Sequence, residues 1–418
     1  MELTYNNDNY FFSILTPDLG LVGNQQKALK YISQNVINFS IDEEVGKITT
    51  GTLSLHDDDG LYSNIFRPGR QFNISWGYKK YNILNPLSMN GASRTGLQCV
   101  IQQPSGSGSG GDTTYNVKFY STEFMDGRKF KTYSDGTRGT VVYNLLLDLG
   151  CTEILMNFNS MGNAILTGNQ IIQDESSFNL LYKLAAKWNC IFHVGYSKQG
   201  IFGLFIDSTK LQGIEVQQFY QNTTGLTKPV KELYYNCGDK SNVSSFTWEQ
   251  NIGENGTGDG VNLFYLPTGQ IAFQHYVTST QSFDTYVMNT AQMQKDINAQ
   301  PDAASKINLN TQIQKINDFQ TLINKRYFIK YQGTTAPQGF GFTCSCKMIG
   351  DPTISVPMNI VFKGGFPVPL MLSQSQTALP LNTFYLHKST HNISQSGYTM
   401  DITVCDCYNN FIIQQENM

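Results

Sequence analysis

The amino-acid sequence predicts a mainly β protein with an α+β insertion, and three observations carry that prediction. Apolar and polar residues alternate in the first third of the chain, a helical period follows, and alternation returns in the second half. The chain has 418 residues, which corresponds to about three domains at about 150 residues per domain. The predicted domains are 1–125, 126–206 and 207–418.

The first predicted domain has the alternation of antiparallel strands. Apolar residues take every second position, so that one face enters a core and the other meets water. Turn sequences follow at Asp57–Gly60 and Arg67–Arg70. The stretch Pro104–Asp112, rich in glycine and serine, is predicted to be a flexible hairpin tip or linker that orders on assembly. The alternating sets are Ile37, Phe39 and Ile41; Leu53 and Leu55; Phe72, Ile74, Trp76 and Tyr78; and Tyr115, Val117 and Phe119.

The second predicted domain changes to a helical period and forms a small α+β module. A first helix ends at Gly150, and Ser176 or Asp174 caps a second helix. A short hairpin of Cys190–Val194 and Gly203–Ile206 is predicted to follow. The apolar stripes of the two helices are Val142, Leu145, Leu146 and Leu149, then Phe178, Leu181, Leu184, Ala185 and Trp188.

The third predicted domain returns to strands and contains a helical insertion at about 286–326. Isoleucines recur there mostly at helical spacings, and Pro301-Asp302 is a suitable start. We expect a helical hairpin inserted in a β domain. The isoleucines are Ile307, Ile313, Ile316 and Ile323, and the closing strands are predicted at Phe342–Met348, Thr353–Phe362, Thr383–His387 and Tyr398–Val404.

The composition excludes several classes of protein. Charged residues make up 15% of the chain, against about 25% in an average domain. The formal net charge of -3 gives no basic field of the kind that marks nucleic-acid binders, so no direct recognition of nucleic-acid sequence is expected. Aromatic residues at 12% argue against a disordered chain. Few charges and many amides suit a subunit that neighbours cover.

The sequence predicts synthesis in a cytoplasm. Its first residues lack a basic segment followed by an apolar one, as an export signal would have. No run of about 18 apolar residues predicts a membrane span, so no stable membrane insertion is expected. The 8 cysteines are too few for a disulfide scaffold, and most lie singly in apolar segments, as small core residues do.

Two Cys-x-Cys pairs are the candidate metal site. Cys344 with Cys346 and Cys405 with Cys407 supply four thiols, a number that suits zinc. On a strand, however, the first pair shares the apolar face, whereas regular alternation places the second pair on the face of Asp401 and Thr403. The two pairs then need not meet. Structural cysteines are the favoured interpretation, a metal or a disulfide is the alternative, and we predict no cofactor.

Other polar residues give weaker signals. The run Asp57–Gly60 could contact calcium but lacks the remaining ligands of an EF-hand loop, so a solvated turn is favoured. His387 and His391 are four residues apart on a predicted strand and turn, where that spacing does not bring them together, so core or positioned histidines are expected. Isolated histidines stand at His56, His193 and His275.

Enzymatic motifs are absent from the sequence. It contains no G-x-S-x-G, H-E-x-x-H, phosphate-binding loop or dinucleotide fingerprint. Glu123, Asp126 and Asp135 lie close in sequence and leave a glycosidase pair of carboxylates open. Aromatic strands could also stack on oligonucleotides or sugars, although alternation places most aromatic residues in the core. We predict no catalytic residues, with a glycan-degrading or glycan-binding β protein as the alternative.

Four stretches in a fixed order carry a family resemblance. Together they resemble the central hub of contractile phage tails, the family of the late control gene D protein, the T-even baseplate hub and the first part of type VI secretion spike proteins. The stretches are Val36–Ser54 leading through Phe66–Arg70 to Phe72–Gly77; Gly139–Gly150; Gln173–Cys190; and Gly350–Ile360 with Phe384–Leu386, His391–Ser394 and Gly397–Thr399.

The resemblance implies two tube-like β-barrel domains in each chain and a homotrimer. Six similar units would dock on a sixfold tail tube on one side and on a threefold central spike on the other, around a channel for cargo. Tail tube protein, spike protein and other baseplate subunits are the implied partners, and the virion tail or a related injection particle is the implied location. Host, tail type, and virus versus domesticated device stay open.

Overall fold

The structure is a computed structural model of the chain, and the mainly β fold class with an α+β insertion is confirmed. None of the described residues forms a helix long and apolar enough to cross a membrane. The residues that the structure describes are 2–6, 10–15, 35–57, 60, 62, 65–78, 93–109, 112–157, 166, 171–188, 190–197, 200–207, 219, 230–251, 262–265, 271–277, 282–299, 301–302, 328–330, 341–366 and 383–405.

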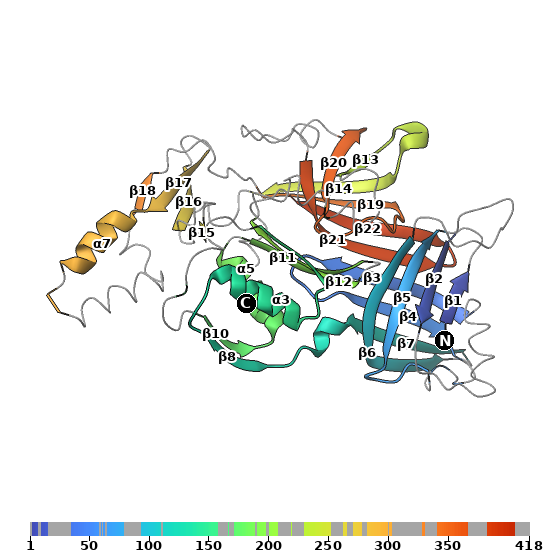
Figure 1. Cartoon of the computed structure of the whole chain (residues 1–418). Coiled ribbons are helices and arrows are strands. Elements are labelled where there is room, and N and C mark those ends of the chain that lie inside the picture. Colours follow the sequence, from blue (N-terminus) through green and yellow to red (C-terminus); the bar gives the residue numbers. More distant parts are fainter. Residues whose placement is uncertain are drawn as a thin grey trace.

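One 13-stranded sheet contains strands from both ends of the chain (Figure 1). Its first unit has the order β1-β2-β5-β6-β7-β4-β3, and its second unit contains β13, β14, β19, β20, β21 and β22. The first unit comprises β1 (Glu2–Asn6), β2 (Tyr10–Leu15), β3 (Val36–Glu44), β4 (Thr50–His56), β5 (Gln71–Tyr78), β6 (Ser93–Ser109) and β7 (Asp112–Ser121). The second comprises β13 (Val230–Tyr234), β14 (Val243–Asn251), β19 (Gly341–Ile349), β20 (Asn359–Gly364), β21 (Thr383–Ser394) and β22 (Gly397–Cys405).

The second unit curls back on itself. Its ladders run β13-β20-β21-β22-β19-β14, and an isolated bridge between Tyr235 and Val243 then joins the end of β13 to the start of β14. Asn242 N also donates to Tyr234 O at 3.1 Å. This return to the first strand gives the second unit the hydrogen-bonded circuit of a small barrel. Aromatic rings of Tyr235, Phe246, Phe362, Phe366 and Phe384 contact one another in its core.

The first unit also folds its sheet over a core. The rings of Phe12 on β2 and Phe39 on β3 stack with centroids 4.2 Å apart, although four other strands separate β2 from β3 in the sheet order. Phe72 and Phe119 meet edge to face in the same core. Most of the alternating residues therefore turn inward, as predicted: Phe72, Ile74 and Trp76 on β5 are buried. Ile37 is an exception, since it lies at a bulge of β3 and is only half-buried.

A direct ladder joins the two units. β3 pairs antiparallel with β21, with Ile41 opposite His391 and Asp42 opposite Thr390. On its other side, β21 pairs with β22 along most of its length. The N-terminal and C-terminal parts of the chain therefore share one continuous sheet rather than packing as separate layers.

The α+β module carries both predicted helices. Thr137 caps the first through a bond from Thr140 N, and Gly150, with φ of +80°, follows its end. Val142, Leu145 and Leu146 on this helix are buried, as predicted. β11 and β12 form the predicted hairpin, and β9 pairs with β12. The elements are η2 (Thr122–Met125), β8 (Lys129–Tyr133), α3 (Arg138–Asp148), β9 (Glu153–Asn157), β10 (Ile171–Glu175), α5 (Ser177–Lys187), β11 (Cys190–Ser197) and β12 (Gly200–Asp207).

Two expectations need correction. The predicted hairpin is formed by β6 and β7, but Pro104–Ser109 is strand and not loop, because β6 pairs with β7 as far as Ser109 opposite Asp112. Residues 110 and 111 lie outside the described residues. Glycine and serine give no hydrophobic alternation, so the ladder could not be recognised from the side chains. A separate four-stranded sheet, β15-β16-β17-β18, also flanks the predicted helical insertion: three of its strands come before it in the chain and β18 comes after it.

One helix of the predicted insertion is found beside that sheet. α7 (Thr290–Asn298) starts after the cap Asn289 and ends before Pro301-Asp302, so those two residues do not begin it. The isoleucines of the expected second helix lie outside the described residues, and the domain boundaries stay predictions. In Figure 1 this sheet and α7 lie at the left, away from the first unit. Its strands are β15 (Asn262–Tyr265), β16 (Ile271–Val277), β17 (Ser282–Met288) and β18 (Phe328–Lys330), and a 3-10 turn, η4 (Gly238–Lys240), follows β13.

Candidate functional site

A polar sheet surface extends across both β units. On each strand the residues between the buried ones point away from the core, and on seven neighbouring strands these residues are mostly serine, threonine, asparagine or charged residues. We call this surface the polar face. Its members are Ser245 and Thr247 on β14, Ser345 and Lys347 on β19, Thr399, Asp401 and Thr403 on β22, Lys388, Thr390 and Asn392 on β21, Ser40 and Asp42 on β3, Thr50, Thr52 and Ser54 on β4, and Asn116 and Lys118 on β7.

Hydrogen bonds between strands hold the polar face together. Thr390 Oγ1 donates to Asp42 Oδ1 at 2.5 Å across the junction of the two units. Within the first unit, Ser40 and Thr52 share a bond of 2.8 Å. Such cross-strand pairs stabilise a sheet by about 0.2–1 kcal/mol each. These hydrogen bonds also hold the side chains of the polar face in fixed positions.

The polar face is hollowed over the second unit. The hollow has a volume of about 390 Å³ and lies over β14, β19, β22 and β21. Two rows of register partners line it. The first row is Thr247, Ser345, Thr403 and Lys388; the second is Ser245, Lys347, Asp401 and Thr390.

A buried ion pair lies beneath the junction of the units, on the core side of the sheet. Arg94 on β6 donates to Glu43 on β3 through Nη1 at 2.6 Å, and its Nη2 lies 2.5 Å from the other carboxylate oxygen. Arg94 Nη1 also donates to Ile354 O at 3.1 Å. Burial raises the pKa of Glu43, while the Arg94 guanidinium opposes that rise. The pair fastens three separate segments of the core to one another.

His391 lies beside this ion pair and is fully buried. Its Nδ1 shares a 2.8 Å hydrogen bond with Tyr398 OH, and its ring meets Trp76 edge to face. Burial lowers the pKa of His391 to about 3, and the nearby charge of Arg94 lowers it further in the same direction. The prediction of a core histidine is confirmed here. His387, four residues away, instead faces Glu44 at 3.5 Å.

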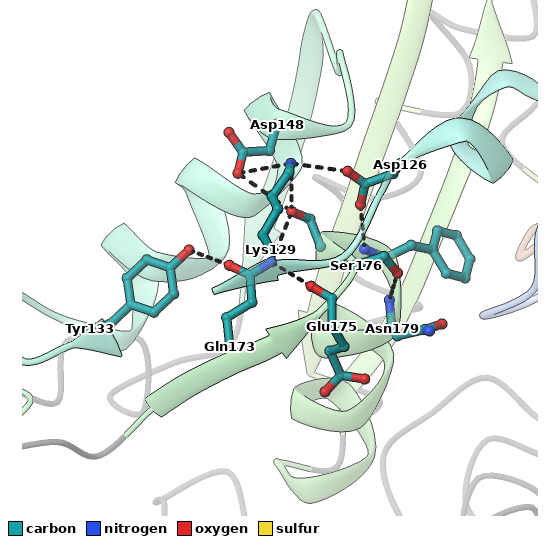
Figure 2. Close-up of polar contacts among 10 residues, drawn as sticks. Asp126, Lys129, Tyr133, Asp148, Gln173, Glu175, Ser176 and Asn179 are labelled. Carbon is teal, nitrogen blue, oxygen red and sulfur yellow. Dashed lines mark hydrogen bonds and ion pairs between the residues drawn. The ribbon is translucent and has the colours of Figure 1, made fainter. Parts of the chain in front are cut away.

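A second polar network holds the α+β module together (Figure 2). Lys129 Nζ lies 2.9 Å from Asp126 and 3.3 Å from Asp148, so that it ties β8 to α3. Partial burial lowers the pKa of Lys129, but the carboxylates of Asp126 and Asp148 outweigh this effect and raise the pKa above its ordinary value. Gln173 on β10 accepts a bond from Tyr133 OH at 3.0 Å and donates to Glu175 O. The network joins two strands to a helix of the module and therefore acts as a structural support.

The carboxylates considered for a glycosidase pair are engaged in structural contacts. Glu123 is buried and accepts a short hydrogen bond from Tyr196 OH; its burial raises its pKa. Asp126 accepts from Phe178 N at 3.3 Å besides its contact with Lys129. Asp135 accepts from Ser134 Oγ. A glycosidase needs two carboxyl groups that flank a substrate in one cleft, and these contacts serve the fold instead.

The predicted solvated turn at Asp57–Gly60 is wrong for its first residue. Asp57 is only 5% exposed, and its carboxylate accepts from Tyr62 N at 3.3 and 3.4 Å. A side chain that accepts bonds from a nearby backbone stabilises a turn from within. Asp58 and Asp59 lie outside the described residues.

The cysteine pairs occupy different environments. Cys344 and Cys346 are buried with their sulfur atoms 3.6 Å apart, and the hydrogen bond between them raises the pKa of Cys346. In the ladder with β22, Val404 is opposite Cys344 and Cys405 is opposite Thr343, so Cys405 faces the other side, yet it is also buried. Cys407 lies outside the described residues. Within them, no group of three His, Cys, Asp or Glu side chains is placed to hold a metal.

Comparisons with known proteins give likeness of structure only. No family model matches the chain, and no curated protein matches it. Among solved structures, a tail protein of Neisseria meningitidis MC58 has 9% identity and a TM-score of 0.48, with 95% of this chain and 96% of that chain covered. An E. coli component of the type VI secretion system has 10% identity and a TM-score of 0.43, with 90% and 74% covered. A 43 kDa tail protein of prophage MuSo2 from Shewanella oneidensis has 10% identity and a TM-score of 0.44, with 89% and 93% covered.

Proposed function

We propose that this chain is the structural hub of a phage tail or of a phage-like contractile injection particle. It would act as a homotrimeric adaptor between a sixfold tail tube and a threefold central spike, with a channel for cargo. The ordered sequence resemblance supports this proposal, and one structural observation carries it. That observation is the polar face, which extends without a break from the second β unit into the first through the ladder of β3 and β21.

The polar face suits the wall of a water-filled channel. Soluble proteins bury apolar surface and leave polar surface in water. Among the described residues, Ile349 at the end of β19 is the one large exposed hydrophobic residue on this side of the sheet, opposite Thr399. Most of its members carry short hydroxyl or amide groups, and its lysines and aspartates bring charges of both signs. A wall of this kind would let cargo move without binding it strongly along most of its length.

Two β units side by side also suit a change of symmetry. Three chains that each present two similar units give six units around an axis, which matches a sixfold partner, while the trimer itself matches a threefold one. Cyclic closure would place the outer strands of each sheet beside those of the next chain and so cover exposed edges. The adaptor has no turnover in this proposal, and no residue is assigned a catalytic role.

The first experiment is light scattering of the purified full chain over a range of concentrations. A particle of about 141 kDa, three times 46.9 kDa, supports the hub. Pull-down of tail tube and spike proteins from the same particle would then identify the two docking sides. A chain that stays monomeric, and that fails to join either partner in the pull-down, contradicts the proposal.

The inserted region is proposed to contact another baseplate subunit. α7 and the four-stranded sheet project from the module and the second unit (Figure 1). Removal of 286–326 should leave the trimer intact and block assembly of complete particles. Normal particles from the deleted chain would contradict this role.

Release of muropeptides from cell wall by the purified chain would contradict the purely structural function.

A further inference from the structure

The hollow on the polar face has the composition of an anion-binding site. Ser345 and Thr403 lie next to each other in its floor, on neighbouring strands. Lys388 follows Thr403 in the same row, and Lys347 follows Ser345 by two residues along β19. Short hydroxyl side chains thus form the bottom, and two long cationic side chains rise at its borders.

The spacing of the sheet lets both lysines reach one bound group. Neighbouring strands lie about 4.8 Å apart and residues on one face repeat about every 7 Å along a strand. Lys388 is therefore about 5 Å from Thr403 between backbones, and Lys347 is about 8–9 Å from it on the diagonal. A lysine side chain spans such distances, so both ammonium groups can meet above Thr403.

Cationic groups outnumber carboxylates among the residues that line the hollow. The lysines bring two ammonium groups, and Ser345, Thr403 and Thr247 bring hydroxyls. Asp401 is the one carboxylate there, and it already accepts from Asn392 Nδ2 at 3.2 Å. No ion pair joins Lys347 or Lys388 to a carboxylate within the described parts of the chain. Counted over the lining residues alone, the charge is +1. Glu44 on β3 is opposite Lys388 in the neighbouring ladder, but its carboxylate is paired with Lys47 at 2.8 Å. A ligand that brings oxygen acceptors and negative charge therefore suits the two lysines.

We propose that this hollow binds a phosphate-type oxyanion, with Lys347 and Lys388 as the charged contacts and the hydroxyls of Ser345 and Thr403 as donors. Charge-assisted hydrogen bonds to an oxyanion are roughly twice as strong as neutral ones. The volume of about 390 Å³ falls within the range of about 300–1,000 Å³ that is usual for small-ligand sites. The same chemistry accepts a free phosphate compound or a phosphate of a nucleic-acid backbone. The site does not depend on trimer formation or on a role in a tail.

Isothermal titration of the full chain with pyrophosphate tests the proposal. We expect one pyrophosphate for each chain, and at least tenfold weaker binding in Lys347→Gln and in Lys388→Gln. Thr403→Val, which exchanges the hydroxyl for a methyl group in a similar shape, should weaken binding to a smaller extent. Lys118→Gln is the matched control because Lys118 is an exposed lysine of the same face on β7, far along the sheet from the hollow. Its affinity should stay within twofold of the unchanged chain.

Two results would overturn the oxyanion site. One is the absence of pyrophosphate binding at millimolar concentration to the folded chain. The other is an equal loss in Lys118→Gln and Lys347→Gln, since that indicates general attraction to a surface. An oligothymidylate of eight nucleotides distinguishes the two sources of the bound phosphate. If it competes with pyrophosphate, the natural ligand is a phosphate of a nucleic-acid backbone. If it does not compete, the ligand is a free phosphate compound. Thermal unfolding of each variant checks that the sheet is intact.

Discussion

Arg94 and Glu43 form a two-pronged ion pair inside the protein, with side-chain exposures of 8% and 0%. The pair spans the core from β6 to β3, and β3 is the strand that joins the first unit to β21 of the second unit. Ser389 on β21 adds a contact to the same carboxylate at 3.5 Å. Both charges are desolvated, so each depends on the other for its stability in the core.

We therefore expect Arg94→Met to lower the free energy of unfolding by about 3–5 kcal/mol, because it leaves Glu43 buried without a countercharge. The double variant Arg94→Met/Glu43→Leu should recover much of that loss, since an apolar pair of similar size carries no desolvation cost. Urea unfolding of the three proteins measures both effects. The coupling between the two sites is the difference between the double variant and the sum of the single ones.

The exposed pair of Arg128 and Asp174 is the control for this measurement. These side chains are 63% and 55% exposed and lie 2.8 Å apart. Water screens exposed pairs, and they contribute little to stability, so Arg128→Met should cost little. If Arg94→Met costs no more than Arg128→Met, the buried pair does not fasten the junction.

Burial makes His193 on β11 a source of acid instability. It is 0% exposed, neither ring nitrogen has a hydrogen-bond partner within the described structure, and burial together with Arg94 lowers its pKa to about 3. The unfolded chain takes up a proton near pH 6.5, whereas the folded chain does so only near pH 3. Stability is thus fully present above pH 6.5 and falls as the pH decreases from about 6.5 to 3.

His193→Leu should remove this part of the pH dependence. Protonation of His193 in the unfolded chain lowers the free energy of unfolding by about 3 kcal/mol at pH 4.5. Between pH 7 and 4.5, the free energy of unfolding of the variant should therefore fall by about 3 kcal/mol less than that of the unchanged chain. At pH 7 the variant should be as stable or slightly more stable, because two unpaired nitrogen atoms leave the core. Chemical unfolding at both pH values measures the difference. His56→Gln, an exposed change on β4, should alter neither value, and parallel pH profiles for His193→Leu and the unchanged chain would refute the assignment.

Lys129 should matter to the α+β module more than its partial exposure suggests. It contacts Asp126, Asp148 and the hydroxyl of Ser177, so its loss removes three contacts and takes the cationic partner from two carboxylates (Figure 2). We expect Lys129→Met to reduce the free energy of unfolding by about 1–2 kcal/mol. Lys183→Met removes a single exposed pair with Glu175 and should change it by less than about 0.5 kcal/mol. Equal effects of the two changes in urea unfolding would show that the network adds nothing.

The regular parts of the fold could be predicted from the sequence because their side chains repeat. Phe72, Ile74 and Trp76 turn inward from β5 as their alternation indicates, and the stripe of Val142, Leu145 and Leu146 turns inward from α3. The same logic could have found the ion pair. Because every second residue of β3 faces the core, Glu43 must face it as Ile41 does. A charged side chain that faces a core needs a buried partner of opposite charge.

The remaining features depend on contacts between distant parts of the chain. The ladder of β3 and β21 joins residues more than 340 positions apart, and no local pattern selects one strand as the partner of another. The hollow likewise arises because β14, β19, β22 and β21 are neighbours. Lys347 and Lys388 look like ordinary surface lysines in the sequence, and only the register places both beside Thr403.

Gly195 on β11 leaves room for an aromatic ring on the next strand. It lies directly opposite Phe202 in the ladder, and a Cβ at this position would lie 2.3 Å from the ring atom Cζ of Phe202. Phe202 is buried, so it cannot rotate into water, and its ring has to shift within a packed core. Overpacking of this kind costs about 1–3 kcal/mol, which is the loss expected for Gly195→Ala in thermal or urea unfolding. Gly127→Ala is the control because a Cβ there meets nothing within 4 Å, and it should change stability by less than about 0.5 kcal/mol. Equal stability of the two variants would mean that the ring of Phe202 yields to the added methyl group.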